Sequence, residues 1–217
     1  MLQVRSRGNK MTTGVIAQDS HDEHHDDHKM TGIKRWLYTT NHKDIGTLYL
    51  WFAFIMFLTG GALAMVIRAE LFQPGLQIVE PDFFNQLTTV HGLVMVFGAI
   101  MPAFTGFANW MLPMMLGAPD MALPRMNNWS FWILPFAFAI LLGSFFMESG
   151  APNFGWTFYA PLSTTYSNGS TAFFVFAVHI MGISSIMGAI NIVVTIMNMR
   201  APGMTYMKMP LFVWTFF

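Results

Sequence analysis

The chain has 217 residues, of which 54% are hydrophobic and only 10% are charged, whereas about 25% of the residues in a soluble domain are charged. It contains no cysteine, which excludes disulfides, thiolate zinc sites and iron–sulfur clusters. The net charge is zero and the basic residues form no patch of the kind that binds nucleic acid. The composition therefore predicts a membrane protein with a few spans and no nucleic-acid partner.

Residues 1–33 are polar and lack the apolar core of a signal peptide. We expect this segment to be a disordered cytoplasmic tail, and residues 34–217 to form the transmembrane domain. The tail contains four histidines between His21 and His28, interspersed with acidic residues. This run could bind a divalent metal weakly, although a solvated tail is the simpler interpretation.

Four apolar segments are long enough to cross a hydrocarbon core of about 30 Å. They cover residues 46–67, 86–112, 129–147 and 170–197. We expect Thr40 or Asn41 to cap the first helix and Asn127 with Asn128 to cap the third. Residues 209–217 are apolar but too short to span, so they predict the start of a fifth span in a fragment of a longer protein. The predicted fold class is an all-α polytopic transmembrane helix bundle.

The cations of the short loops set the orientation of such a bundle, because they gather on the cytoplasmic side. Arg68 alone falls on one side of the predicted membrane. The other side carries Arg5, Arg7, Lys10, Lys29, Lys34, Arg35, Lys43, Arg125, Arg200 and Lys208. The N-terminus is therefore predicted to be cytoplasmic, in a bacterial inner membrane.

Two histidines lie at comparable depth in neighbouring predicted spans. An imidazole in hydrocarbon is costly, and an intramembrane ionisable residue suggests a functional site. His91 lies in the second span and His179 in the fourth. Imidazole is a common axial ligand of haem iron, so the two could clamp one haem. Each could equally form only a hydrogen bond between helices.

The outer membrane edge carries three further candidates. Arg68 could pair with Glu70 or with a bound cofactor, although a side chain that reaches to the interface is the simpler interpretation. Glu70 and carbonyl groups near Gly75 could ligate calcium or sodium. Trp156 is typical of an interfacial aromatic belt.

The cytoplasmic half carries polar groups that could hold a file of water molecules. Asp120 follows the second span, and Asn109 lies five full α-helical turns beyond His91, so both side chains point the same way on an ideal helix. Pro102 is expected to bend that helix. The further polar groups are Asn127, Ser130, Ser184, Ser185 and Asn191. Capping and interhelical hydrogen bonds remain the alternative.

From Trp36 onward the chain resembles subunit I of the haem–copper oxidases, in the cytochrome c oxidase branch. The resemblance covers nearly everything after the tail, in the same order. The stretches that carry it are Thr40-Asn-His-Lys-Asp-Ile-Gly-Thr-Leu-Tyr49, Ile67-Arg-Ala-Glu-Leu-Phe-Gln-Pro-Gly75, Val90-His-Gly-Leu-Val-Met95, Leu116-Gly-Ala-Pro-Asp-Met121, Pro124-Arg-Met-Asn-Asn128, Ser184-Ser-Ile-Met-Gly-Ala-Ile-Asn191 and Pro210-Leu-Phe-Val-Trp214.

The resemblance implies roles for individual residues. His91 would be an axial ligand of the low-spin haem a, with its partner histidine on a later helix rather than at position 179. Arg68 would contact the formyl group of that haem, and Trp156 would pack near the haems. Glu70 and Gly75 match the calcium or sodium site of the family. Asp120 would be the entrance of a proton pathway, with Asn109, Asn127 and Asn191 as its constriction and Ser130, Ser184, Ser185 and Tyr49 along its route.

The resemblance also implies what lies elsewhere. The family has a twelve-helix subunit with a high-spin haem and CuB, and the ligands of both would lie beyond this chain, which holds no catalytic residue. The expected function is that of a respiratory terminal oxidase that moves electrons from cytochrome c to oxygen and pumps protons. Its partners would be subunits II and III, cytochrome c and membrane lipid. The alternatives are a small carrier with one haem between His91 and His179, a quinol-using member of the family, and a transporter or structural membrane subunit.

Overall fold

The structure, a computed structural model, describes residues 32–217. The histidine-rich run between His21 and His28, and most of the predicted tail, lie outside the described residues. Every regular element in the described part is a helix. Four segments are long and apolar enough to cross a membrane, which confirms the four predicted spans and the all-α class.

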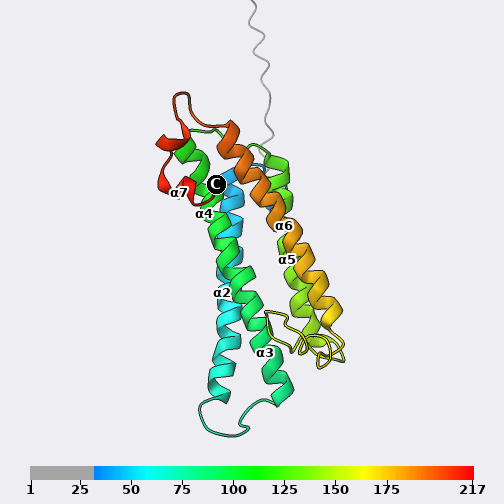
Figure 1. The fold of residues 1–217 in the computed structure, drawn as a ribbon. Helices are drawn as coiled ribbons and strands as arrows, with labels where there is room; N and C mark the ends of the chain where they lie inside the picture. Colours follow the sequence, from blue (N-terminus) through cyan, green and yellow to red (C-terminus); the bar gives the residue numbers. More distant parts are fainter. Residues whose placement is uncertain (1–31) are drawn as a thin grey trace, which may run out of the picture. The chain divides into compact units, whose positions relative to one another are not determined.

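The spanning segments pack as two pairs (Figure 1). In the first pair, α2 (His42–Glu70) lies along α3 (Pro81–Leu93), the π-helical segment η1 (Val94–Ile100) and α4 (Met101–Leu116). In the second, α5 (Pro124–Gly143), extended by the 3-10 turn Ser144–Phe146, lies along α6 (Thr171–Asn198). Contacts of α2 with α5 and of α4 with α6 join the pairs.

Three short helical elements complete the described part. The helix α1 (Ile33–Tyr38) precedes α2, and a 3-10 turn (Tyr206–Lys208) follows α6. The last element, α7 (Leu211–Trp214), is a single turn. Its Val213 is fully buried in a cluster with residues of α4 and α6. Whether residues 209–217 begin a fifth span stays a prediction.

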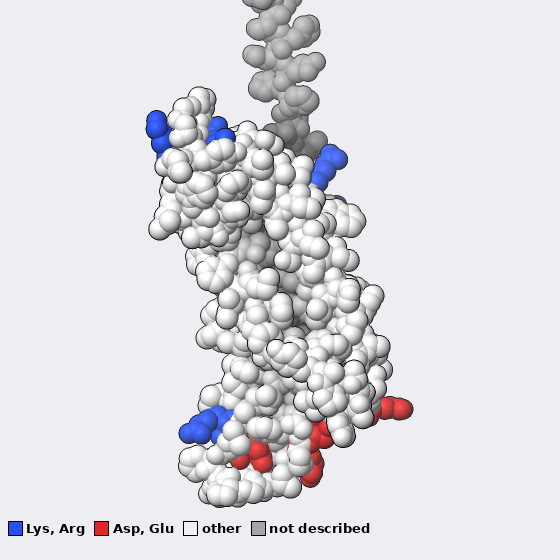
Figure 2. All heavy atoms as spheres, viewed as in Figure 1, with Lys and Arg blue, Asp and Glu red and all other residues white. Residues whose placement is uncertain are grey.

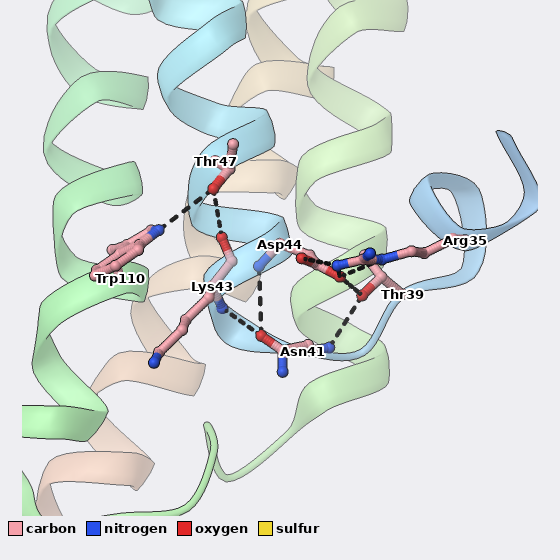
Figure 3. A network of polar contacts seen from close by, with 7 residues as sticks. All are labelled: Arg35, Thr39, Asn41, Lys43, Asp44, Thr47 and Trp110. Carbon is pink, nitrogen blue, oxygen red and sulfur yellow. Dashed lines mark hydrogen bonds and ion pairs between the residues drawn. The ribbon is translucent and has the colours of Figure 1, made fainter. Parts of the chain in front are cut away.

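The start of α2 is fixed by polar contacts from its own first turn and from α1 (Figure 3). The Asn41 side chain accepts hydrogen bonds from the amides of Lys43 and Asp44, at 2.8 and 3.4 Å, which confirms Asn41 as the cap. Arg35 binds the Asp44 carboxylate through both Nε and Nη2, the latter at 2.8 Å. These hydrogen bonds and the charge attraction raise the pKa of the Arg35 guanidinium above its usual value.

The third span begins earlier than predicted. Pro124 occupies the first turn of α5, where its missing N–H costs no helical hydrogen bond. The predicted cap at Asn127 and Asn128 is therefore wrong, because both residues already lie inside the helix. Asn128 instead donates to the carbonyls of Leu37 and Thr39, at 3.1 and 3.0 Å, and ties α5 to the chain before α2.

Two glycines allow α2 and α4 to approach closely. A Cβ atom built on Gly46 would lie 2.9 Å from the Gly106 carbonyl oxygen, and one built on Gly106 would lie 3.1 Å from the Gly46 oxygen. Small residues at such crossings let helices in a membrane gain packing energy through their backbones. The contact therefore depends on the absence of side chains at both positions.

The second span is not one ideal helix. The amide of Met101 donates to the carbonyl of Val96, five residues earlier, at the end of the π-helical segment Val94–Ile100. Pro102 follows directly and has no N–H to donate. A π-helical insertion of one residue rotates the following helix by about 100° relative to an ideal α-helix. The ideal register assumed between His91 and Asn109 therefore does not hold.

Charges lie at the two ends of the described part, with an uncharged belt between them (Figure 2). Lysines and arginines gather at the end that carries α1, the start of α5 and the end of α6, and a single arginine stands with acidic groups at the other end. This separation is what a membrane-spanning bundle requires.

We predict that Gly46→Ala destabilises the protein by about 1–3 kcal/mol, because the added methyl group would overlap the α4 backbone. Gly61→Ala is the matched control on the same helix, since nothing lies within 4 Å of a Cβ built there. Thermal unfolding of both variants in one detergent measures the difference. Equal unfolding temperatures would contradict the close crossing.

Candidate functional site

His91 is held by a backbone carbonyl of the neighbouring helix. Its Nδ1 atom lies 2.9 Å from the carbonyl oxygen of Gly60 in α2. A carbonyl oxygen can only accept, so Nδ1 carries a proton, and in the neutral imidazole Nε2 then keeps its lone pair. Histidines that bind metals show this arrangement, in which the second ring nitrogen donates to a carbonyl and fixes the ring.

The surroundings of His91 fit a metal-binding imidazole held between closely packed segments. A Cβ atom on Gly60 would lie 2.5 Å from the sulfur of Met95, so a larger residue at position 60 would have to displace the Met95 side chain. Gly92 is equally restricted, because a Cβ atom there would lie 2.8 Å from the ring of Trp156. The indole of Trp156 thus covers the helix backbone directly beside His91.

His179 does not join His91. It is exposed on α6, and its Nδ1 atom lies 2.7 Å from the carbonyl oxygen of Val175 in its own helix. The helix α6 packs mainly on α5, whereas His91 faces α2. Within residues 32–217, no group of three or more metal-ligating His, Asp or Glu side chains is present.

Arg68 forms no ion pair with Glu70, the less favoured of the alternatives that the sequence left open. Arg68 is exposed, and the single ion pair of the described part joins Arg35 to Asp44. The Glu70 carboxylate instead accepts hydrogen bonds from three successive loop amides, at 2.9, 2.6 and 3.0 Å; the donors are Gln77, Ile78 and Val79. Gly75 lies in the same loop with φ of 93°, a left-handed conformation that favours glycine.

Five of the polar residues predicted in the cytoplasmic half form one connected network. Asn127 Nδ2 donates to Asn109 Oδ1 at 2.6 Å, which links α5 to α4. Ser130 Oγ donates to the Asn127 carbonyl at 2.8 Å and lies 3.0 Å from the Tyr49 hydroxyl of α2. Ser184 of α6 donates to the Ser130 carbonyl at 2.5 Å. Four helices therefore contribute to a single buried chain of polar groups.

A cavity of about 290 Å³ adjoins this network. Tyr49, Ser184 and Ser185 place hydroxyl groups on its lining, and the rest of the wall is mostly apolar. One water molecule takes about 30 Å³ in the liquid, so the cavity has room for several. Water with hydroxyl partners on one side can pass protons along hydrogen bonds.

The loop that carries Asp120 is fastened to α6. Asn191 Oδ1 accepts from the amide of Leu123 at 2.8 Å, and Thr195 Oγ1 accepts from the amide of Ala122 at 2.9 Å. Asp120 itself accepts from the following amide, that of Met121, at 2.6 Å. Asn191 therefore holds the loop that carries Asp120 against α6.

Two residues that make hydrogen bonds in this part of the structure, Thr195 and His42, were not predicted from the sequence. Thr195 lies one helical turn beyond Asn191, and that spacing was the available signal. His42 is buried, and its Nδ1 atom lies 2.8 Å from the Asn109 carbonyl oxygen. The sequence gives no sign of this contact, because His42 and Asn109 are far apart in the chain and meet only where α2 crosses α4.

Comparison with known protein families identifies the family to which the chain belongs. The family model described as cytochrome c and quinol oxidase polypeptide I matches residues 44–217. The chain belongs to this oxidase polypeptide I family. The match covers every spanning segment described above, including both the His91 region and the polar network.

Curated relatives agree with the family assignment. One is named cytochrome c oxidase subunit 1, from Corynebacterium efficiens, and is 45% identical over 194 residues, or 88% of this chain and 33% of the relative. Another, from Streptomyces avermitilis, is named "Probable cytochrome c oxidase subunit 1-alpha" and is 45% identical over 184 residues, or 84% of this chain and 32% of the relative. The chain spans about a third of the length of these oxidase relatives.

In this oxidase-family chain, we predict that Thr195→Val loosens the Asp120 loop, because the Ala122 amide loses its acceptor. Hydrogen exchange at that amide should accelerate about tenfold, which corresponds to roughly 1.4 kcal/mol. Thr59→Val is the control, since the Thr59 hydroxyl bonds only to Ile55 of its own helix. Unchanged exchange at Ala122 would contradict the assigned contact.

Proposed function

We propose that this chain is the N-terminal part of the catalytic subunit of a respiratory terminal oxidase, which transfers electrons from cytochrome c to oxygen and pumps protons. The observation that carries the proposal is the arrangement of His91 in a member of this family. The Gly60 carbonyl accepts a hydrogen bond from Nδ1 and leaves Nε2 for a metal. The same spanning segment leads to the polar network of the other half.

His91 would bind the iron of a low-spin haem a through Nε2, and the haem would supply one-electron transfer. The chain's own residues orient the imidazole through Gly60 and cover the neighbouring backbone with Trp156. Arg68 would contact the formyl group of the haem, and its exposed side chain leaves it free to do so. A second histidine that would hold the iron is expected outside this chain.

The polar network would bring protons from the cytoplasmic side. Asp120 would collect them, and its loop is tied to Asn191. Asn109, Asn127 and Asn191 would form a constriction, and two of these amides already share a 2.6 Å hydrogen bond. Beyond it, the hydroxyl groups of Tyr49, Ser130, Ser184 and Ser185 would line the route along the cavity.

The remaining parts of the proposal concern the complete enzyme. The full subunit would hold a high-spin haem and CuB, and the complex would include subunits II and III with cytochrome c as donor. Glu70 and the Gly75 carbonyl would bind calcium or sodium with the lone pairs that the loop amides leave free. The charge separation supports a cytoplasmic N-terminus in a bacterial inner membrane.

The observations favour this proposal over its alternatives. A carrier with one haem between His91 and His179 is disfavoured, because His179 is exposed on a helix that packs mainly on α5. The family description includes quinol oxidases, but both relatives cited above carry names of cytochrome c oxidases. These names support cytochrome c as the electron donor.

In the assembled complex, His91→Ala should abolish the absorbance of the low-spin haem, because the iron loses an axial ligand. His179→Ala should leave that spectrum intact, since its imidazole is hydrogen-bonded to its own helix. Reduced-minus-oxidised spectra of the two variants measure the difference. Loss of the low-spin signal in His179→Ala would instead support the small carrier.

Asp120→Asn should lower oxygen consumption about tenfold or more and reduce proton ejection, because it removes the charge that gathers protons. Glu80→Gln is the control, as it neutralises an exposed acid at the opposite end of the protein. Oxygen uptake and pH changes of reconstituted vesicles measure both steps. Wild-type turnover and proton ejection in Asp120→Asn would refute the assigned role.

A further inference from the structure

The loop of residues 147–170, between the 3-10 turn after α5 and the start of α6, is fastened to α3 (Figure 1). Three α3 side chains make the contacts. Asp82 Oδ1 accepts from the Asn153 side chain at 2.7 Å, and Gln86 Oε1 accepts from the Ala151 amide at 3.0 Å. Thr89 Oγ1 accepts from the Gly155 amide at 2.9 Å.

The three anchors form one stripe along the helix. Positions 82, 86 and 89 are four and three residues apart, which places them on one α-helical face. Gln86 also donates to Asp82 Oδ2 at 2.7 Å, so the anchors support one another. Gln86 and Thr89 are buried, with 6% and 1% of their surface exposed. The loop amides that they bind are therefore shielded from competing water.

These anchors determine where Trp156 lies. Trp156 follows Gly155 directly, so the bond to Thr89 fixes the backbone one residue before the indole. The ring then rests against Gly92, one helical turn beyond Thr89, and contacts the ring of Phe97 with centroids 6.5 Å apart. Gly92 is the residue next to His91.

We propose that Asp82, Gln86 and Thr89 are positioning residues that hold Trp156 beside His91 and so limit the access of water to its imidazole. This role rests on the proposed function, in which His91 binds a haem iron. Solvent exposure is one of the factors that set the potential of a bound iron centre. Water stabilises the oxidised iron, which carries one more positive charge, so release of Trp156 lowers the midpoint potential.

The test uses Thr89→Val in the assembled oxidase complex. Valine keeps the shape of threonine but removes the acceptor of the Gly155 amide. We expect hydrogen exchange at Gly155 and Trp156 to accelerate about tenfold. We also expect the midpoint potential of the low-spin haem to fall, with the reduced-to-oxidised ratio at a fixed potential lower by about threefold or more.

Thr88→Val is the matched control. Thr88 is the preceding residue, is exposed, and its hydroxyl bonds only to the Phe84 carbonyl of its own helix. Neither the exchange rates nor the potential should change. Asp82→Ala is a second variant for the case that Thr89→Val does not assemble, because Asp82 is exposed and its loss removes the bonds to Asn153 and Gln86 but leaves that of Thr89 to the loop. Asp82→Ala should also accelerate hydrogen exchange at Gly155 and Trp156 and lower the midpoint potential, but by less than Thr89→Val.

The outcomes separate the two proposals. A faster exchange together with a lower potential supports the positioning role. Faster exchange with an unchanged potential overturns it, and so does unchanged exchange. A wild-type complex without a low-spin haem spectrum would instead refute the proposed function, and it would do so before any variant is compared.

Discussion

The packing of the helices and the position of His91 both depend on how closely α2 approaches the second spanning segment. Glycines at two levels of α2 permit this approach: Gly46 meets the backbone of α4 at Gly106, and Gly60 offers its carbonyl to His91. In hydrocarbon, helices gain little from hydrophobic burial and associate through close packing and hydrogen bonds. The contact between Gly60 and His91 therefore both joins α2 to the second span and orients the imidazole.

The π-helical segment allows the second span to direct one polar side chain to α2 and another to α5. On an ideal helix, His91 and Asn109 would share a face. The insertion in Val94–Ile100 removes this constraint, and His91 turns to α2 while the Asn109 side chain turns to Asn127 of α5. Pro102 contributes, because it cannot donate the hydrogen bond that would continue the regular helix. His91 and Asn109 can therefore face different neighbouring helices although both lie on the second span.

The sequence was sufficient for the features that depend on composition and local pattern. Apolar length located the four spans, and the side-chain chemistry of Asn41 predicted its cap. It was insufficient where tertiary contacts decide. Pro124 starts α5 ahead of the expected asparagine caps, and the hydrogen bonds of the Glu70 carboxylate to loop amides could not be predicted from the sequence. The role of Thr89 required the structure, because its partner is a backbone amide of a distant loop, and for Thr195 the spacing from Asn191 indicates a shared helix face but not the loop amide that it binds.

The polar network itself implies water. Asn127 Oδ1 and Asn191 Nδ2 are buried and lack a hydrogen-bond partner among the described atoms. Each such atom costs about 1–3 kcal/mol if it stays unpaired, and in a membrane interior no bulk water can relieve it. One is an acceptor and the other a donor, on α5 and α6. The cost of leaving these two amides dry thus favours bound water at each of them, and hydration of buried polar groups is the physical property that a proton pathway needs.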